Sequence, residues 1–447
     1  MKRICILIVC LFAAFTSLSA QEITGKWYGV ADLGVMKLRI HFALEKSGDT
    51  YSGTMTSPDQ GNTVVPITKV TWDTKELVLE IAPLHFTYKA TWKEGVLDGS
   101  FSQMGQSFPL QLSREEVQVK RPQEPKAPLL YKEEEVSFRN EKAGVTLAGT
   151  LTIPAKGEKF PAVVMVTGSG AQDRDEKIMG HKPFWVIADY LTRQGILVFR
   201  YDERGVGASE GDYTSCGLTD FAADAAAAMA WLKTRKEVDP QRVGIIGHSE
   251  GGAVAVLLAS QGIPSFVVSL AGPGVNGREV LRSQRDMLFR VSGLTDDYIL
   301  PYNEAMKKVE DVVLGAATDK ETLKEQVKVI VNGTPLAGQE EEIIRQMTTP
   351  AILSLLQYDP AVFFKEIQCP VFALNGDKDM QVIAQPNLKG FEQITANGNK
   401  AVTIKKYPGL NHLFQTAITG MPTEYGEIEE TISPVVLEDM AKWISER

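Results

Sequence analysis

One stretch decides the fold of this sequence: Gly247-His248-Ser249-Glu250-Gly251-Gly252. It has the spacing G-x-S-x-G, follows the apolar run Val243–Ile246, and leads into the helix-like segment Ala253–Ser260. Glycines on both sides of the serine permit a sharp turn in which larger side chains would collide, and such a turn exposes the hydroxyl. The pattern therefore predicts a strand–turn–helix unit that presents Ser249 as a nucleophile.

Strands and helices alternate on both sides of this unit. Continuous apolar runs, typical of strands buried on both faces, lie at Pro161–Val166, Phe266–Leu270 and Val371–Leu374. Amphipathic segments that predict helices lie at Phe184–Arg193, Asp220–Lys233 and Val436–Ser445. This alternation predicts an α/β fold, in which a mostly parallel sheet is covered by helices on both faces. A charged, helix-like segment at about residues 276–359 interrupts it, and we interpret this segment as a cap insertion.

The N-terminal part of the chain follows a different pattern. Residues 21–114 alternate polar and apolar side chains, as in Lys37–Leu44, and short turn signals separate the runs. Seven or eight short antiparallel strands of this kind predict a small all-β barrel or sandwich. Residues 115–134 are charged and rich in proline, which is typical of a linker. The predicted α/β domain then occupies residues 135–447.

A serine nucleophile needs a base, and the base needs an acid that holds it in place. The candidate base is His412, in the loop after the last predicted strand. The sequence has five histidines, and the other four lie in the β region, before a helix, or beside the serine on the turn: His41, His85, His181 and His248. We expect His248 to have a packing role, because adjacent side chains on a tight turn point apart. The acid should follow an intervening strand, where Asn375-Gly376-Asp377-Lys378-Asp379 offers Asp377 or Asp379.

Residues 135–447 resemble the α/β-hydrolase superfamily, and in particular bacterial secreted carboxylesterases related to the serine aminopeptidases and prolyl-oligopeptidase-like hydrolases. The resemblance rests on the serine turn and on three further stretches: Val166–Asp175, Tyr201–Ser209 and Cys369–Val382. In such proteins the second aspartate of a Gly-Asp-x-Asp stretch is the acid of the triad. The resemblance therefore implies the catalytic triad Ser249, Asp379 and His412, in that chain order.

Acyl transfer also needs an oxyanion hole, which consists of two N–H groups directed at the developing negative charge. One donor is expected from Glu250, the residue after the nucleophile. The other is expected from the loop after Val166, where many relatives carry His-Gly-x and this chain has Thr167-Gly168-Ser169. Ser169 is the candidate for this second donor, and Gly170 is the alternative.

These residues predict a secreted serine hydrolase that cleaves carboxylic esters through an acyl-enzyme intermediate. The expected partner is a small-molecule ester, and the predicted chemistry requires no metal and no organic cofactor. Two alternatives remain at this point. One is a serine peptidase or aminopeptidase that uses the same triad. The other is a ligand- or glycan-binding role dominated by the N-terminal β domain.

Composition and charge exclude several other classes of protein. The 447 residues are 44% hydrophobic and 23% charged, which is ordinary for a globular protein and excludes collagen, coiled coils and general disorder. With 47 basic and 56 acidic residues the net charge is −9, and no basic block occurs. Nucleic-acid binding through phosphate neutralisation is therefore not expected.

The first residues predict export. Lys2 and Arg3 precede the apolar run Ile4–Phe15, and small residues lead up to Ala20. This is the pattern of a secretory signal peptide over residues 1–20, cleaved after Ala20, so we expect a periplasmic or extracellular protein. An uncleaved signal that anchors the chain is the alternative. No later run of about 18 apolar residues occurs, and we expect no stable membrane insertion.

Overall fold

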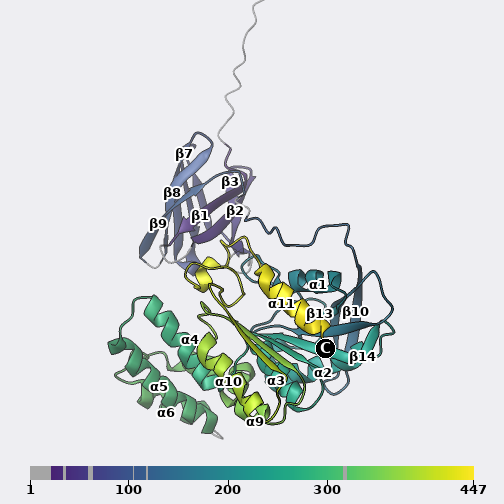
Figure 1. The fold of residues 1–447 in the computed structure, drawn as a ribbon. Helices are drawn as coiled ribbons and strands as arrows, with labels where there is room; N and C mark the ends of the chain where they lie inside the picture. The colour runs from purple at the N-terminus through teal and green to yellow at the C-terminus, as the bar shows by residue number, and fades with distance from the viewer. Residues whose placement is uncertain (1–21, 34–36, 59–63, 104, 117–118, 316–319) are drawn as a thin grey trace, which may run out of the picture. The chain divides into compact units, whose positions relative to one another are not determined.

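The computed structural model describes residues 22–33, 37–58, 64–103, 105–116, 119–315 and 320–447. The predicted signal peptide, residues 1–20, lies outside the described residues. The chain divides between residues 118 and 119 into two compact units (Figure 1).

The first unit contains two antiparallel sheets. The four-stranded sheet has the order β1-β2-β3-β4, with β1 Gly25–Asp32, β2 Lys37–Ser47, β3 Thr50–Thr56 and β4 Val65–Pro66. The five-stranded sheet has the order β5-β6-β7-β8-β9, with β5 Lys69–Trp72, β6 Glu76–Ile81, β7 Phe86–Lys93, β8 Val96–Gln103 and β9 Gln106–Leu112. Two main-chain hydrogen bonds of 2.9 Å between Tyr28 and Ser113 link β1 to the residue after β9. The predicted all-β region is thus confirmed.

Aromatic side chains fill the core of this unit. Trp27, Phe42 and Tyr88 are almost completely buried, and alternate residues of β2 point inward as the period of two requires. Trp27 packs edge to face against Trp92, with 5.5 Å between the ring centroids. The Tyr88 hydroxyl lies 3.1 Å from the main-chain carbonyl of Leu97, so its polar end is satisfied inside the core.

The second unit is built on an eight-stranded sheet with the order β10-β11-β13-β12-β14-β15-β16-β17 (Figure 1). β11 pairs antiparallel with β10 and β13, and all the other neighbours are parallel. The strands are β10 Lys132–Asn140, β11 Val145–Ile153, β12 Phe160–Val166, β13 Leu197–Tyr201, β14 Val238–His248, β15 Val267–Leu270, β16 Val371–Gly376 and β17 Val402–Tyr407. This arrangement confirms the α/β-hydrolase fold. The carboxyl ends of the parallel strands share one edge of the sheet, and the loops that leave this edge carry the candidate site.

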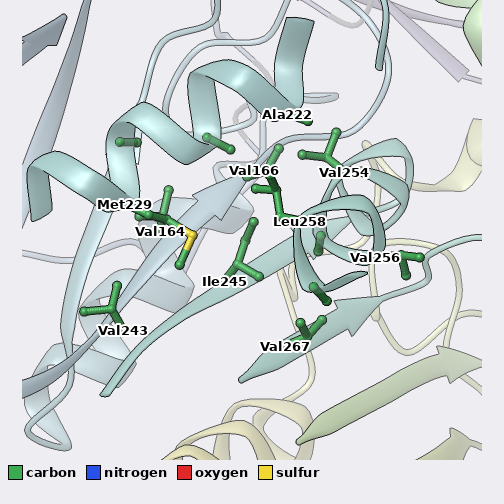
Figure 2. Packing of buried hydrophobic residues seen from close by; sticks show 14 of the residues in the cluster. Val164, Val166, Ala222, Met229, Val243, Ile245, Val254, Val256, Leu258 and Val267 are labelled. Atoms are coloured by element: carbon green, nitrogen blue, oxygen red, sulfur yellow. The ribbon is translucent and has the colours of Figure 1, made fainter. Parts of the chain in front are cut away.

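Helices cover both faces of the sheet. α1 (Pro183–Arg193) and α11 (Pro434–Ser445) pack on one face, against Val163 and Met165 of β12. α2 (Leu218–Leu232), α3 (Glu250–Ser260), α9 (Pro360–Phe364) and α10 (Ala384–Ala396) pack on the other. Figure 2 shows this second core, where Val164 and Val166 meet Ala222 and Met229 of α2 and Val254 of α3. Alternate side chains of one strand therefore reach both cores, which explains its continuous apolar sequence.

The cap is a separate helical layer inserted between β15 and α9. Its helices are α4 (Gly277–Val291), α5 (Asp296–Gly315), α6 (Lys320–Val331), α7 (Glu340–Met347) and α8 (Pro350–Gln357). They enclose an apolar cluster of their own, which includes Met306, Val309 and Val327. None of the helices in the described part of the chain is long and apolar enough to cross a bilayer.

Residues that precede β10 form an arm that is bound to the second unit. The Arg121 guanidinium donates to the main-chain carbonyls of Met179 and Gly180, and also to those of Gly426 and Ile428. Gln123 hydrogen-bonds the main chain of residues 431 and 432. The arm thus joins two loops that lie far apart in the sequence.

Candidate active site

Ser249 lies on a sharp turn between β14 and α3. Its backbone angles, φ +51° and ψ −118°, fall in a region that residues other than glycine rarely adopt. The turn is possible because its glycines leave no room for a side chain. A Cβ atom on Gly247 would lie 2.0 Å from the Gly251 carbonyl oxygen, and one on Gly251 would lie 2.2 Å from that of Val166. The sequence pattern therefore has a direct steric cause.

His412 and Asp379 meet beside this turn. His412 lies in the β17 loop (residues 408–421), and Asp379 lies in the β16 loop (residues 377–383). His412 Nδ1 is 2.7 Å from Asp379 Oδ2, and both side chains are buried. Asp379 Oδ1 accepts hydrogen bonds from the main-chain N–H groups of Gln381 and Val382. The carboxylate is thus fixed by its own loop and in turn fixes one ring nitrogen of His412.

Asp377, the other candidate acid, has a different role. It is exposed, and its Oδ1 accepts a hydrogen bond of 2.7 Å from the main-chain N–H of Gly409. It therefore joins the β16 and β17 loops at their start, while Asp379 is the aspartate that contacts His412.

Ser249 and His412 line the same cavity, which has a volume of about 280 Å³. Outside the cap, the lining contains Gly168, Ser169 and Glu250, and also apolar side chains: Ile178, Pro273, Val382 and Leu413. The cap side is mainly apolar and consists of Val280, Leu281, Gln284, Ile352 and Leu355. The structure therefore brings the predicted Ser249, His412, Glu250 and Ser169 to one cavity, with Asp379 behind His412.

The main-chain N–H groups near Ser249 distinguish the candidate oxyanion donors. Glu250 begins α3, and the first N–H groups of a helix have no acceptor within the helix. In the β12 loop (residues 167–182), Gly168 N–H donates to Glu176 and Gly170 N–H donates to the Tyr213 hydroxyl. The flanking amides are thus already used. Ser169 supplies the amide between them, whereas the alternative donor, Gly170, is occupied.

Glu176 is a site residue that no local sequence pattern indicates. It is 3% exposed, and its Oε1 accepts hydrogen bonds from Gly168 N–H at 2.6 Å and from His248 Nδ1 at 2.9 Å. His248 Nε2 lies 3.1 Å from the main-chain oxygen of His412. His248 therefore does more than pack, since it connects the loops around Ser249. His181, which precedes α1, is completely buried.

Two further carboxylates are buried close to the serine turn. Burial raises the pKa of Glu203 to about 8, although hydrogen bonds from Gln172 N–H and the Thr167 hydroxyl oppose the shift. Burial also raises the pKa of Glu250 to about 7, against a hydrogen bond from the Ser169 side chain. The neutral forms of both groups are thus favoured in the folded protein.

The contribution of Glu203 to the free energy of unfolding should consequently fall as the pH rises from about 5 to about 8. Unfolded Glu203 releases its proton near its ordinary pKa of 4.5, while folded Glu203 keeps it until about pH 8, so the folded state binds more protons in this range. One such proton gives a slope of at most about 1.4 kcal/mol per pH unit. The free energy of unfolding, measured by urea denaturation at several pH values in this range, should depend less steeply on pH in Glu203→Gln than in the wild type. The exposed control Glu158→Gln should show the wild-type dependence on pH. An undiminished slope in Glu203→Gln would contradict the assignment.

Comparison with known proteins gives the family. The sequence profile of the X-Pro dipeptidyl-peptidase (S15) family matches residues 143–409, which is more than half of the chain. The chain belongs to the S15 family. In this S15 family member the match includes Ser249 and Asp379 and ends just before His412.

Individual relatives of this S15 protein carry other descriptions. Esterase EstD of Thermotoga maritima is 28% identical over 305 residues, which are 67% of this chain and 65% of the esterase. An uncharacterised Mycobacterium tuberculosis protein is 37% identical over 125 residues, which are 28% of this chain and 41% of that protein. The matches thus span less than two thirds of the length of these relatives. Among solved structures, the α/β hydrolase GrgF of a Penicillium species has a TM-score of 0.45 at 17% identity, with coverage of 70% of this chain and 98% of that one.

Proposed function

We propose that this protein is a serine hydrolase that cleaves carboxylic esters through an acyl-enzyme intermediate. The observation that carries the proposal is the 2.7 Å hydrogen bond between His412 and Asp379 beside a cavity that also contains Ser249. A serine hydroxyl at its ordinary pKa is a weak nucleophile, and an oriented imidazole provides the base that activates it.

In the proposed reaction, Ser249 Oγ attacks the acyl carbon while His412 Nε2 accepts the hydroxyl proton. Asp379 accepts from Nδ1–H, which keeps Nε2 available as the base and stabilises the imidazolium that forms. The N–H groups of Glu250 and Ser169 bind the oxyanion. His412 then gives its proton to the leaving alcohol. In the second half of the reaction, His412 accepts a proton from water, the water oxygen attacks the acyl carbon, and Ser249 is released as the proton returns to its Oγ. Besides the ester and the attacking water, these steps use groups of the chain itself.

The cavity favours an uncharged acyl group. Its cap side consists of aliphatic side chains and Gln284, and none of the described residues that line it is Lys or Arg. The acyl chain is expected to lie against Val280, Leu281 and Leu355. A volume of about 280 Å³ suits a small acyl group better than a long fatty chain.

A peptidase function is the second candidate, because the family is described by X-Pro dipeptidyl-peptidase activity. Such an activity would need a carboxylate that binds the terminal ammonium of the peptide. Among the described residues that line the cavity, the carboxyl groups are those of Glu176, which already binds Gly168 and His248, and Glu250, whose neutral form burial favours. These two observations support the ester as the proposed substrate in preference to a dipeptide.

Substrate comparison tests this proposal. Purified full-length protein and its Ser249→Ala variant would be assayed with p-nitrophenyl esters of increasing acyl length, beside an aminoacyl-prolyl anilide. Ester turnover that is highest for short acyl groups and absent from the variant would support the esterase. Anilide turnover that exceeds ester turnover would replace it with the peptidase.

We also propose that the protein is exported, as the pattern of residues 1–20 indicates. N-terminal sequencing of the protein secreted from a bacterial host should then begin at Gln21. A chain that retains residues 1–20 would contradict cleavage after Ala20.

A further inference from the structure

The ring of His248 faces a hydrogen-bond acceptor on each side. Nδ1 lies 2.9 Å from Glu176 Oε1, and Nε2 lies 3.1 Å from the main-chain oxygen of His412. A carbonyl oxygen can only accept. Glu176 Oε1 also accepts from Gly168 N–H at 2.6 Å, as an ionised carboxylate would. A neutral imidazole has a single N–H and could satisfy only one of these acceptors, whereas an imidazolium satisfies both.

We infer that His248 is a buried imidazolium that, together with Glu176, holds the β12 and β17 loops in position around Ser249. His248 is thus a positioning residue that acts through Gly168 and the main chain of His412. Its effect on catalysis rests on the proposed function, but its protonation state does not.

The charges around His248 agree with this inference. Burial by itself lowers the pKa of His248, but the Glu176 carboxylate and the carbonyl of His412 outweigh burial, and the pKa is raised. Asp379 acts in the same direction from the β16 loop. The His412 ring packs against His248 with 4.8 Å between the ring centroids. Glu203 is a further buried carboxyl that interacts electrostatically with Glu176, and burial raises its pKa to about 8, which favours its neutral form.

Removal of the negative charge at Glu176 should break the link that His248 makes between the β12 and β17 loops. In Glu176→Gln, the amide oxygen can take the place of Oε1 and accept from both Gly168 and His248. Without its counter-charge a buried imidazolium is strongly disfavoured, so His248 becomes neutral. It then keeps the Nδ1 proton, and the lone pair of Nε2 faces the carbonyl of His412. The variant therefore changes the charge while it preserves the shape of the site.

Kinetics of three variants test the positioning role. Glu176→Gln and His248→Gln should each lower kcat by about 10- to 100-fold with little change in KM, which is the usual cost of losing a group that orients a catalytic side chain. The double variant should cost no more than either single change, because the two residues act as one unit. His85→Gln is the control. It alters an exposed histidine of the N-terminal unit, which the proposed site does not include, and should retain the wild-type kcat.

Nitrogen NMR of the full-length protein with ¹⁵N-labelled histidine tests the protonation state directly. The wild type should show one histidine, absent from the His248→Gln spectrum, that carries protons on both ring nitrogens at neutral pH. In Glu176→Gln this residue should carry one. A neutral His248 in the wild type would overturn the inference, as would additive effects of the two substitutions on kcat.

The rate at which a fluorophosphonate labels Ser249 separates this inference from the proposed function. A wild type that neither reacts with the probe nor turns over esters would refute the serine hydrolase, and the NMR signature alone would then decide the state of His248. A reactive wild type with an equally reactive Glu176→Gln would refute the positioning role and leave the hydrolase intact.

Discussion

Replacement of Ser249 by alanine is expected to lower kcat for the best ester substrate by about 10⁴- to 10⁶-fold while the protein stays folded. The side chain lost is the proposed nucleophile, and alanine can keep the backbone of the turn. Initial rates under saturating substrate measure the effect, and circular dichroism checks the fold. Ser260→Ala, at the other end of α3, is the matched control, because its hydroxyl donates a hydrogen bond to the Leu257 carbonyl within the same helix.

The same reasoning extends to the base. His412→Ala should reduce kcat by a comparable factor, and the Ser249→Ala, His412→Ala double variant should be no slower than the worse single variant, because a triad acts as one unit. A loss of less than about tenfold in Ser249→Ala would remove this serine from the mechanism. Additive losses would mean that the two side chains act in separate steps.

Asp379→Asn should lower kcat by about 10⁴-fold, because it moves the proton of His412 from Nδ1 to Nε2. Asp379 Oδ1 accepts from Gln381 N–H and Val382 N–H, so the oxygen of an asparagine would stay there and its NH₂ group would face His412 Nδ1. Nδ1 must then accept, and the proton moves to Nε2, which can no longer act as a base toward Ser249.

Asp377→Asn is the natural control for this experiment, since it changes the same atoms two residues away in the same loop. Its oxygen can still accept from Gly409 N–H, and kcat should change by no more than a few-fold. Enzyme turnover as a function of pH for both variants provides the comparison. A larger loss in Asp377→Asn than in Asp379→Asn would reassign the acid.

Local sequence patterns were sufficient to predict the parts of the site that depend on strand ends. The turn around Ser249 requires glycine for steric reasons, and this requirement is visible as G-x-S-x-G. Strands such as β12 are apolar throughout because their side chains pack into the cores on both faces of the sheet, so the sheet was predictable as well. Loops that follow parallel strands emerge at one edge, which is why residues as distant as Ser249 and His412 could be expected near one another.

Contacts between loops could not be predicted in this way. Glu176 lies in a polar loop without periodicity, and only its burial beneath Gly168 and His248 shows its importance. The cavity side chains of the cap were also missed, because Val280 and Leu281 have the same amphipathic pattern as helices that pack only on each other. Such residues are defined by where two segments meet, and a pattern within one segment does not contain that information.

The arm that contains Arg121 limits where this chain can be divided. A chain shortened to residues 135–447 would keep every strand that carries the proposed triad, but it would lose the guanidinium that joins Met179 and Gly180 to Gly426 and Ile428. The loop anchored in this way is the one that bears Glu176. When the N-terminal module is exchanged between relatives, the second unit should therefore keep all residues from 119 onward. It then retains the arm that holds its two loops together.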